Sequence, residues 1–297
     1  MAEGTVSMIV TTPDGRDLDV NVSGPPEGMP FFFHHGTPGS GLQFQAMVDA
    51  ASQRGLRTIT YSRPGYARSS PHPGRSVADA AADVALILDE LPAERFVTAG
   101  WSGGGPHALA CAALLPGRCL GAATIASVAP FDAEPLDFLA GMGDENVEEF
   151  GLAVQGPGRL TPWLEEQALE LATVRGNEVA AELGGLVSAV DRLSLTDEFA
   201  DYIAAYFRTA LATGVAGWRD DDLAFVPGWG FDVAAIATPV ALWQGGQDFM
   251  VPFAHGEWLA AKVPGARSHM HPEEGHLSLF ASRLGEILDD LLEHAKS

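Results

Sequence analysis

A serine flanked by glycines is the residue in this sequence best placed to do chemistry. Residues 100–104 read Gly-Trp-Ser-Gly-Gly, between a short apolar stretch at 95–99 and an Ala- and Leu-rich stretch at 105–115. Strand, sharp turn and helix in this order are the setting in which a serine is exposed as a nucleophile. The tightness of the turn predicts a positive φ at Ser102. It also explains the glycines at 100 and 104, because side chains there would collide.

Composition limits the kind of protein that could carry this serine. The 297 residues are 46% hydrophobic, enough for one large domain or a core with an insertion. Seventeen basic against 39 acidic residues give a net charge of −22, which disfavours nucleic acid and anionic membranes as partners. No apolar run approaches the ~18–20 residues that span a bilayer, and residues 1–4 begin no signal peptide. We therefore expect a cytoplasmic protein, in which Cys111 and Cys119 are reduced and buried.

Strand-like and helix-like segments alternate along most of the chain, which predicts a doubly wound, mostly parallel sheet. Strand patterns occur at 6–11, 18–22, 30–34, 56–61, 96–99, 120–127, 238–243 and 266–270, and helix patterns at 41–54, 76–91, 105–115, 252–262 and 279–293. The first two strands predict an antiparallel hairpin. Sites in such sheets form at the carboxyl ends of the strands. Ser102 and the loop that begins at His35 both lie at such ends.

The alternation stops between 131 and 235, where acidic helix-like stretches follow one another. We expect helices at 144–152, 162–174, 177–193 and 197–213, separated by breakers such as Gly156-Pro157-Gly158. The sequence thus predicts an α/β core at 1–130 and 236–297 and an inserted helical cap at 131–235. Most aromatic residues of the cap are expected in its own core and a minority facing Ser102: Trp163, Tyr202, Tyr206, Phe207, Trp218, Phe225 and Trp229.

With these segments and motifs, the chain resembles the α/β-hydrolase fold superfamily, in the branch whose members carry a helical cap. The resemblance covers nearly the whole chain outside 131–235. It rests on five motifs in the family's order: His35-Gly36-Thr37-Pro38, Ser62-Arg63-Pro64-Gly65-Tyr66, Gly100-Trp101-Ser102-Gly103-Gly104, Gly245-Gly246-Gln247-Asp248 and Gly275-His276.

The resemblance implies a catalytic triad in the order serine, acid, histidine, which Ser102, Asp248 and His276 obey. A serine hydroxyl is a weak nucleophile and needs a base; a histidine can take its proton near neutral pH. A carboxylate on the other ring nitrogen fixes the tautomer and stabilises the imidazolium. Asp248 follows a predicted strand and His276 lies in a predicted loop, so both are expected near Ser102. Asp132, which follows the preceding strand, is the alternative acid.

The oxyanion that forms after attack needs two preset hydrogen-bond donors. The backbone N–H of Gly103, directly after the nucleophile, is one; by resemblance, the N–H of Thr37 is the other. His35 is expected to support this loop and is a candidate lining residue of the substrate pocket. Trp101, beside the nucleophile, is another.

The resemblance favours a serine hydrolase that cleaves a small, mostly apolar ester, lactone or amide through an acyl-enzyme. A serine at 102 argues against epoxide hydrolase and dehalogenase chemistry, for which similar capped folds carry aspartate. Proline iminopeptidases, carbon–carbon hydrolases and haloperoxidase-like enzymes share the triad and stay open as alternatives. A non-hydrolytic ligand-binding protein is the alternative from another class, although a receptor need not keep the triad.

No cofactor is required for this chemistry, and a small-molecule substrate is the expected partner. His269, His271 and His276 suggest a metal site, but His276 already has a role and no second ligand set is apparent, so we expect none. A homodimer is compatible with the resemblance, because proteins of this fold often form dimers.

Overall fold

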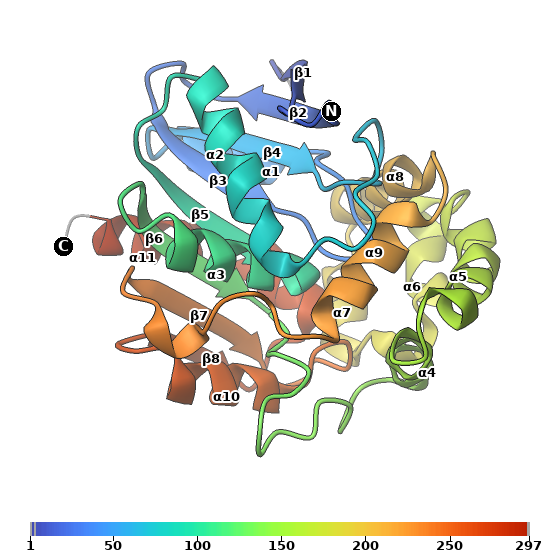
Figure 1. Ribbon diagram of the computed structural model, residues 1–297. Coiled ribbons are helices and arrows are strands. Elements are labelled where there is room, and N and C mark those ends of the chain that lie inside the picture. The colour runs from blue at the N-terminus through green and yellow to red at the C-terminus, as the bar shows by residue number, and fades with distance from the viewer. Residues whose placement is uncertain (1, 3, 296–297) are drawn as a thin grey trace.

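An eight-stranded sheet forms the centre of the computed structural model, which describes residue 2 and residues 4–295 (Figure 1). The strand order is β1-β2-β4-β3-β5-β6-β7-β8. Pairing is antiparallel between β1, β2 and β4 and parallel across the rest, so the predicted fold class is confirmed. The strands are β1 Val6–Thr11, β2 Asp17–Ser23, β3 Met29–His34, β4 Leu56–Ser62, β5 Phe96–Trp101, β6 Cys119–Ile125, β7 Val240–Gly245 and β8 Arg267–His271.

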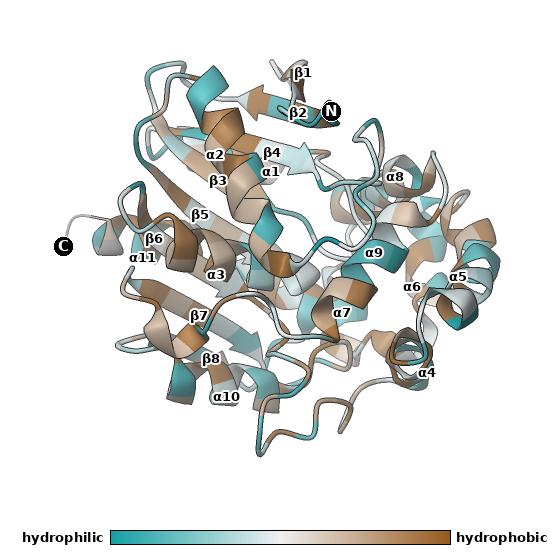
Figure 2. Cartoon of the chain, in the orientation of Figure 1, coloured by the Kyte–Doolittle hydropathy of each residue, from teal (hydrophilic) through white to brown (hydrophobic). Residues whose placement is uncertain are grey.

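The sheet has an apolar core on each face, and the central strands show why. In β3, Phe32 packs into one core while its neighbours Phe31 and Phe33 pack into the other. Successive side chains of a strand point to opposite faces, so a continuous apolar run fits a strand that is covered on both sides. Brown, hydrophobic stretches run along β5 and β7 in Figure 2.

Helices cover both faces of the sheet. Helices α2 (Ala80–Glu90), α3 (Gly105–Leu114) and α10 (Phe253–Lys262) pack on the face of Phe32, and α1 (Gln45–Ser52) and α11 (His276–His294) on the other. The helix was predicted to begin at residue 41, but α1 begins only at Gln45. The carbonyl of Gly41 accepts hydrogen bonds from Thr60 Oγ1 (2.6 Å) and Asn21 Nδ2 (3.0 Å), which hold this segment against the sheet.

A helical insertion lies between β6 and β7, at one end of the sheet (Figure 1). It contains α4 Asp144–Ala153, α5 Pro157–Leu171, α6 Val179–Glu182, α7 Ala189–Ser194, α8 Asp197–Leu211 and α9 Ala216–Phe225. The single helix predicted over 177–193 is wrong, because the chain turns at Gly184 with φ +50°. A helix begins at Pro157, where a break was predicted, because proline is tolerated in the first turn.

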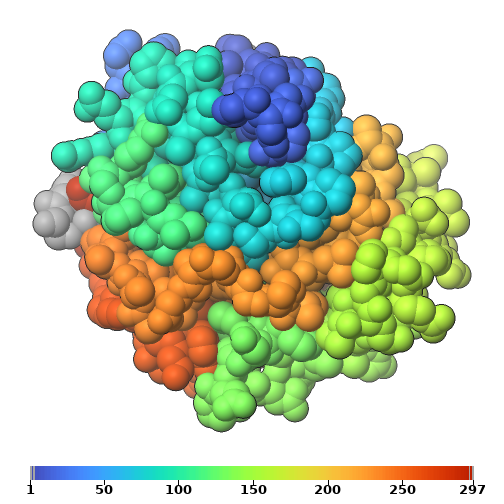
Figure 3. All heavy atoms as spheres, in the orientation of Figure 1, coloured from blue at the N-terminus to red at the C-terminus, as the bar shows by residue number. Residues whose placement is uncertain are grey.

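The insertion packs directly on the core. In Figure 3 the cyan segment that follows β4 meets the orange segment that contains α9. At this contact the N–H of Gly217 donates to the carbonyl of Gly65 (3.2 Å), and Arg75 donates to the carbonyl of Gly217 (3.1 Å). Within residues 2 and 4–295, no helix combines the length and apolar character that crossing a bilayer requires.

Candidate active site

Ser102 stands at the turn between β5 and α3, at the carboxyl end of the central strand. Its φ is +56°, so the predicted left-handed conformation is confirmed. A Cβ at Gly100 would lie 2.1 Å from the carbonyl oxygen of Gly104, which is why a glycine is needed there. His107 Nδ1 lies 2.8 Å from the carbonyl oxygen of Gly103 and ties the turn to the first turn of α3. The backbone thus holds the Ser102 side chain outward, where it lines a cavity.

His276 and Asp248 meet in the same region. His276 Nδ1 lies 2.8 Å from Asp248 Oδ2, and both side chains are buried. Asp248 Oδ1 accepts the N–H groups of Met250 (2.9 Å) and Val251 (2.8 Å), which fixes the carboxylate after β7. The structure brings this pair together and not the alternative acid, since Asp132 is exposed. His276 was predicted in a loop but is the first residue of α11.

The electrostatics of the pair suit a base. Burial acts to lower the pKa of His276, but the carboxylate of Asp248 outweighs it, so this pKa is raised from its ordinary value. Burial also raises the pKa of Asp248, against the opposing effect of His276. With Nδ1 held by Asp248, the free nitrogen Nε2 of His276 is the one available to take a proton.

A carboxylate of the insertion supports the start of α11. Asp191, on α7, is fully buried, and its Oδ1 accepts the N–H groups of Leu277 (2.8 Å) and Ser278 (3.0 Å). These N–H groups follow His276 in the first turn of the helix, where they have no acceptor within the helix itself. The other oxygen, Oδ2, accepts the hydroxyl of Ser188 (2.9 Å). Gly275 makes room for this contact, because a Cβ there would lie 2.5 Å from the carboxylate of Asp191.

The loop expected to supply the second oxyanion donor is held by Arg63, which follows β4. Arg63 Nη2 donates to the carbonyl of Gly36 (2.8 Å) and to Thr37 Oγ1 (3.0 Å). His35 Nε2 accepts the N–H of Arg63 (2.9 Å). His35 is buried in this network and is not a lining residue of the cavity, so the prediction of a pocket role for it is wrong. Its predicted support of the loop agrees with these bonds.

Arg63 is in turn paired with Asp221 of α9. Arg63 Nη2 lies 2.6 Å from Asp221 Oδ2, and Thr37 Oγ1 (2.7 Å) and Tyr66 (2.9 Å) donate to the same oxygen. Arg75 pairs with Asp221 Oδ1 at 2.7 Å. Burial acts to raise the pKa of Asp221, but Arg63 and Arg75 outweigh it and hold this pKa well below its usual range. A carboxylate of the insertion therefore anchors the loop of Thr37.

The cavity lies between the end of the sheet and the insertion, and its volume is about 160 Å³. A single buried water occupies roughly 10–15 Å³, so the cavity has room for a small molecule. Ser102, His276, Thr37, Gly103 and Trp101 all line it. The expectation that most cap aromatics pack in the cap's own core is wrong, because five of the seven line the cavity: Trp163, Tyr206, Phe207, Trp218 and Phe225.

Sequence reasoning missed several residues of this region. It quoted Arg63 only as part of a motif, and it did not single out Asp191, Asp221, Glu149 or Asp222, the last two of which line the cavity. The signal for Asp221 and Asp222 was the run Asp220-Asp221-Asp222, in which all three side chains are buried. Three adjacent acids on one helix face more than one direction, so such a run can reach both the core and the cavity.

Taken together, the geometry can support nucleophilic catalysis. Ser102 lies in a cavity with a histidine whose ring is oriented by a buried carboxylate, which is the arrangement that activates a hydroxyl. Gly103 and Thr37 are close neighbours, since a Cβ at Gly103 would lie 2.4 Å from Thr37 Oγ1. Both residues line the cavity beside Ser102, which is where two donors to the same oxyanion must lie.

Comparison with known proteins gives a match to the family model described as the alpha/beta hydrolase fold, over residues 29–282. A non-heme chloroperoxidase from Streptomyces lividans is 36% identical over 123 residues, 41% of this chain and 45% of that protein. Epoxide hydrolase B from Mycobacterium tuberculosis is 29% identical over 137 residues, 44% of this chain and 37% of that protein. Both similarities thus span less than half of the relative's length. The solved enol-lactonase from Burkholderia xenovorans superposes with a TM-score of 0.70 at 17% identity, covering 98% of this chain and 100% of that one.

Proposed function

The chain belongs to the α/β-hydrolase fold family, and we propose that it is a serine hydrolase that cleaves a small, mostly apolar carboxylic ester, lactone or amide. The observation that carries this proposal is the hydrogen bond of 2.8 Å between Asp248 and His276, since His276 lines the same cavity as Ser102. Apolar walls such as Phe150, Leu183 and Phe207 support an apolar body of the substrate. The enol-lactonase with the same fold opens an ester bond by its name, which agrees with this class of substrate.

The reaction follows from the roles of these groups. Ser102 Oγ attacks the carbonyl carbon while His276 Nε2 takes its proton, and the carbonyl π electrons move onto the oxygen. The N–H groups of Gly103 and Thr37 stabilise that oxyanion. Collapse of the tetrahedral species breaks the bond to the leaving group, which receives the proton from His276. Water then attacks the acyl-enzyme by the same path, and Ser102 regains its proton.

The serine at position 102 argues against epoxide hydrolysis, the activity in the name of one relative. Similar folds that open epoxides use an aspartate at the position of Ser102, because the carboxylate makes an ester with the substrate carbon. A serine alkoxide has no such route to a hydrolysable ester from an epoxide. We therefore place acyl transfer to water first.

The test is a panel of phenyl esters, lactones and anilides with the wild type beside Ser102→Ala. We expect turnover of at least one ester or lactone by the wild type. We also expect its loss in Ser102→Ala, with circular dichroism unchanged. Equal turnover by both proteins would refute the role of Ser102.

The similarity to a chloroperoxidase, at 36% identity, favours haloperoxidase-like activity of the same triad as a second candidate. Halide oxidation by the wild type in the presence of hydrogen peroxide and a carboxylic acid would support it. Ser102→Ala is the control, since a reaction that persists in this variant does not use the triad.

A further inference from the structure

The lining of the cavity beside Ser102 is strongly acidic. Five carboxylate side chains line it, and no lysine or arginine is among its lining residues. Among the lining residues, His276 is the one that can carry a positive charge, and it is already paired with Asp248. The acidic residues are Glu145, Glu149, Glu170, Glu182 and Asp222.

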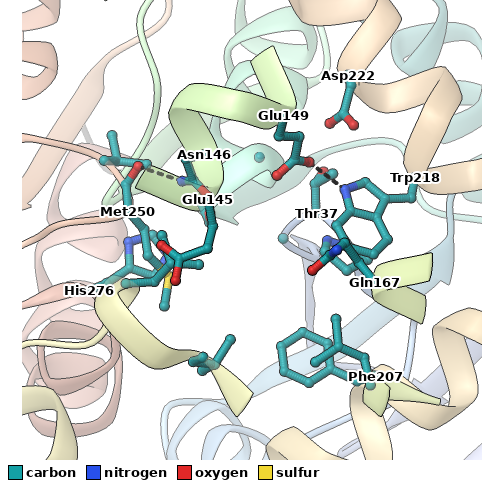
Figure 4. Close-up of a pocket in the computed structure, with 18 of the residues that line it drawn as sticks. Thr37, Glu145, Asn146, Glu149, Gln167, Phe207, Trp218, Asp222, Met250 and His276 are labelled. Carbon is teal, nitrogen blue, oxygen red and sulfur yellow. Dashed lines mark hydrogen bonds between the residues drawn. The ribbon is translucent and has the colours of Figure 1, made fainter. Parts of the chain in front are cut away.

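Asp222 of α9 is the buried member of this set, and Glu149 of α4, which is half-buried, lies beside it. Trp218 Nε1 donates to Glu149 Oε1 at 2.5 Å, which fixes that carboxylate. The Asp222 side chain is only 1% exposed, and no N–H or O–H group of the described residues donates to its Oδ2. Its carboxyl group lies within hydrogen-bond reach of the carboxyl group of Glu149. Figure 4 shows Glu149, Asp222 and Trp218 together on one side of the cavity, across from Met250 and His276.

Two neighbouring carboxylates that no N–H or O–H donor links are costly in this position. Buried polar groups in native proteins are almost always hydrogen-bonded, and a lone buried charge is disfavoured further. Burial raises the pKa of Glu149, and burial together with the charge of Glu149 raises that of Asp222 well above its usual range. Two such carboxylates are stabilised by a proton shared between them or by a cation that donates hydrogen bonds to both.

We propose that the substrate carries an ammonium group, which Glu149 and Asp222 bind while its ester carbonyl lies at Ser102. An ammonium has several N–H donors, so it can satisfy Asp222 Oδ2 and the free lone pairs of Glu149 together. The indole of Trp218 and the ring of Phe207 also line the cavity and favour a cation over a neutral polar group. This inference rests on the proposed hydrolase function and narrows its substrate to an apolar ester with one positive end.

Two isosteric pairs of esters test the inference, because each pair exchanges an ammonium for a methyl group. Phenyl β-alaninate against phenyl butanoate places the charge in the acyl part. 4-(Aminomethyl)phenyl acetate against 4-ethylphenyl acetate places it in the leaving group. The readout is the ratio of kcat/KM for the charged over the neutral ester, which is compared between wild type, Glu149→Gln and Asp222→Asn. Differences in the intrinsic reactivity of the esters cancel in this comparison.

In at least one pair, we expect the wild-type ratio to fall about tenfold or more in each variant, the loss typical of a charged hydrogen bond. Glu148→Gln is the matched control, because Glu148 is exposed on the same helix and does not line the cavity. It should keep the wild-type ratio. Butylammonium should also inhibit the wild type competitively and the two cavity variants more weakly.

The opposing results are distinct. Ratios that are the same in all four proteins for both pairs, with no competitive inhibition by butylammonium, would overturn the ammonium site while leaving the hydrolase intact. No turnover of any of the four esters by the wild type would refute the proposed function on these substrates and this inference with it.

Discussion

Asp191 gives the sharpest test of how the insertion supports His276, the proposed base. Its Oδ1 accepts the N–H groups of Leu277 and Ser278, the two residues that follow His276, at 2.8 and 3.0 Å. Asp191→Asn keeps the shape and an acceptor oxygen but removes the negative charge. We therefore expect a folded protein in which the first turn of α11 is held less firmly.

The size of the effect follows from these contacts. A hydrogen bond to a charged group contributes about 1.5–3 kcal/mol and a neutral one about 0.5–1.5 kcal/mol. Neutralising one acceptor of two bonds should therefore lower the free energy of unfolding by about 2 kcal/mol. A displacement of a catalytic group by about 1 Å can cost roughly 10²-fold in rate, so we expect kcat/KM to fall about 5- to 50-fold.

The pH profile separates positioning from simple loss of stability. The charge of Asp191 helps to raise the pKa of His276, after the larger effects of burial and Asp248. Removing that charge should lower this pKa. Since the neutral imidazole is the active base, the acid limb of kcat/KM should move to lower pH in Asp191→Asn. The assay is ester hydrolysis from pH 5 to 9, with urea unfolding in parallel.

Ser188→Ala is the matched control, because it removes the hydroxyl on Asp191 Oδ2 (2.9 Å) but keeps the charge. It should lower stability and leave the acid limb where it is. An Asp191→Asn protein with wild-type kcat/KM and an unshifted acid limb would refute the reasoning, whatever its stability.

Three further outcomes follow from the site. Asp248→Asn should lower kcat by about 10⁴-fold without unfolding, because the wrong tautomer of His276 is then favoured; saturation kinetics would check this, and a loss under tenfold would contradict it. Asp221→Asn leaves Arg63 with a weaker partner, and both side chains are at most 1% exposed. We therefore expect the free energy of unfolding in urea to fall by about 3–5 kcal/mol. An unchanged urea midpoint would contradict the role of Asp221 as the anchor of the Thr37 loop. The wild-type kcat/KM should fall as the pH drops through an apparent pKa above 6.5, because the pKa of His276 is raised from that value and its protonated form cannot accept the Ser102 proton; an acid limb below 6.5 would disagree.

The sheet could be predicted because its signals are local. The apolar run at 30–34 and the glycines around Ser102 each dictate a backbone conformation without knowledge of distant residues. The motif order then indicated the acid and base, and the structure places Asp248 and His276 within hydrogen-bond distance.

The insertion could not be predicted to the same depth. Helix α9 was missed because Gly217 and three consecutive aspartates have low helix propensity. Tertiary contacts override that propensity: Asp221 pairs with Arg63 and Arg75, and Gly217 packs against Tyr66. The buried carboxylates of the insertion were not singled out, because their partners Arg63, Arg75 and the start of α11 are distant in sequence.

Labelling with a fluorophosphonate tests the central claim, an activated serine at 102, without knowledge of the substrate. Wild type and Ser102→Ala are each treated at neutral pH and measured by intact mass, after their folding and dispersity have been checked. The account predicts a single adduct on the wild type and none on Ser102→Ala. A folded wild type without an adduct, or an adduct that persists in Ser102→Ala, would contradict it.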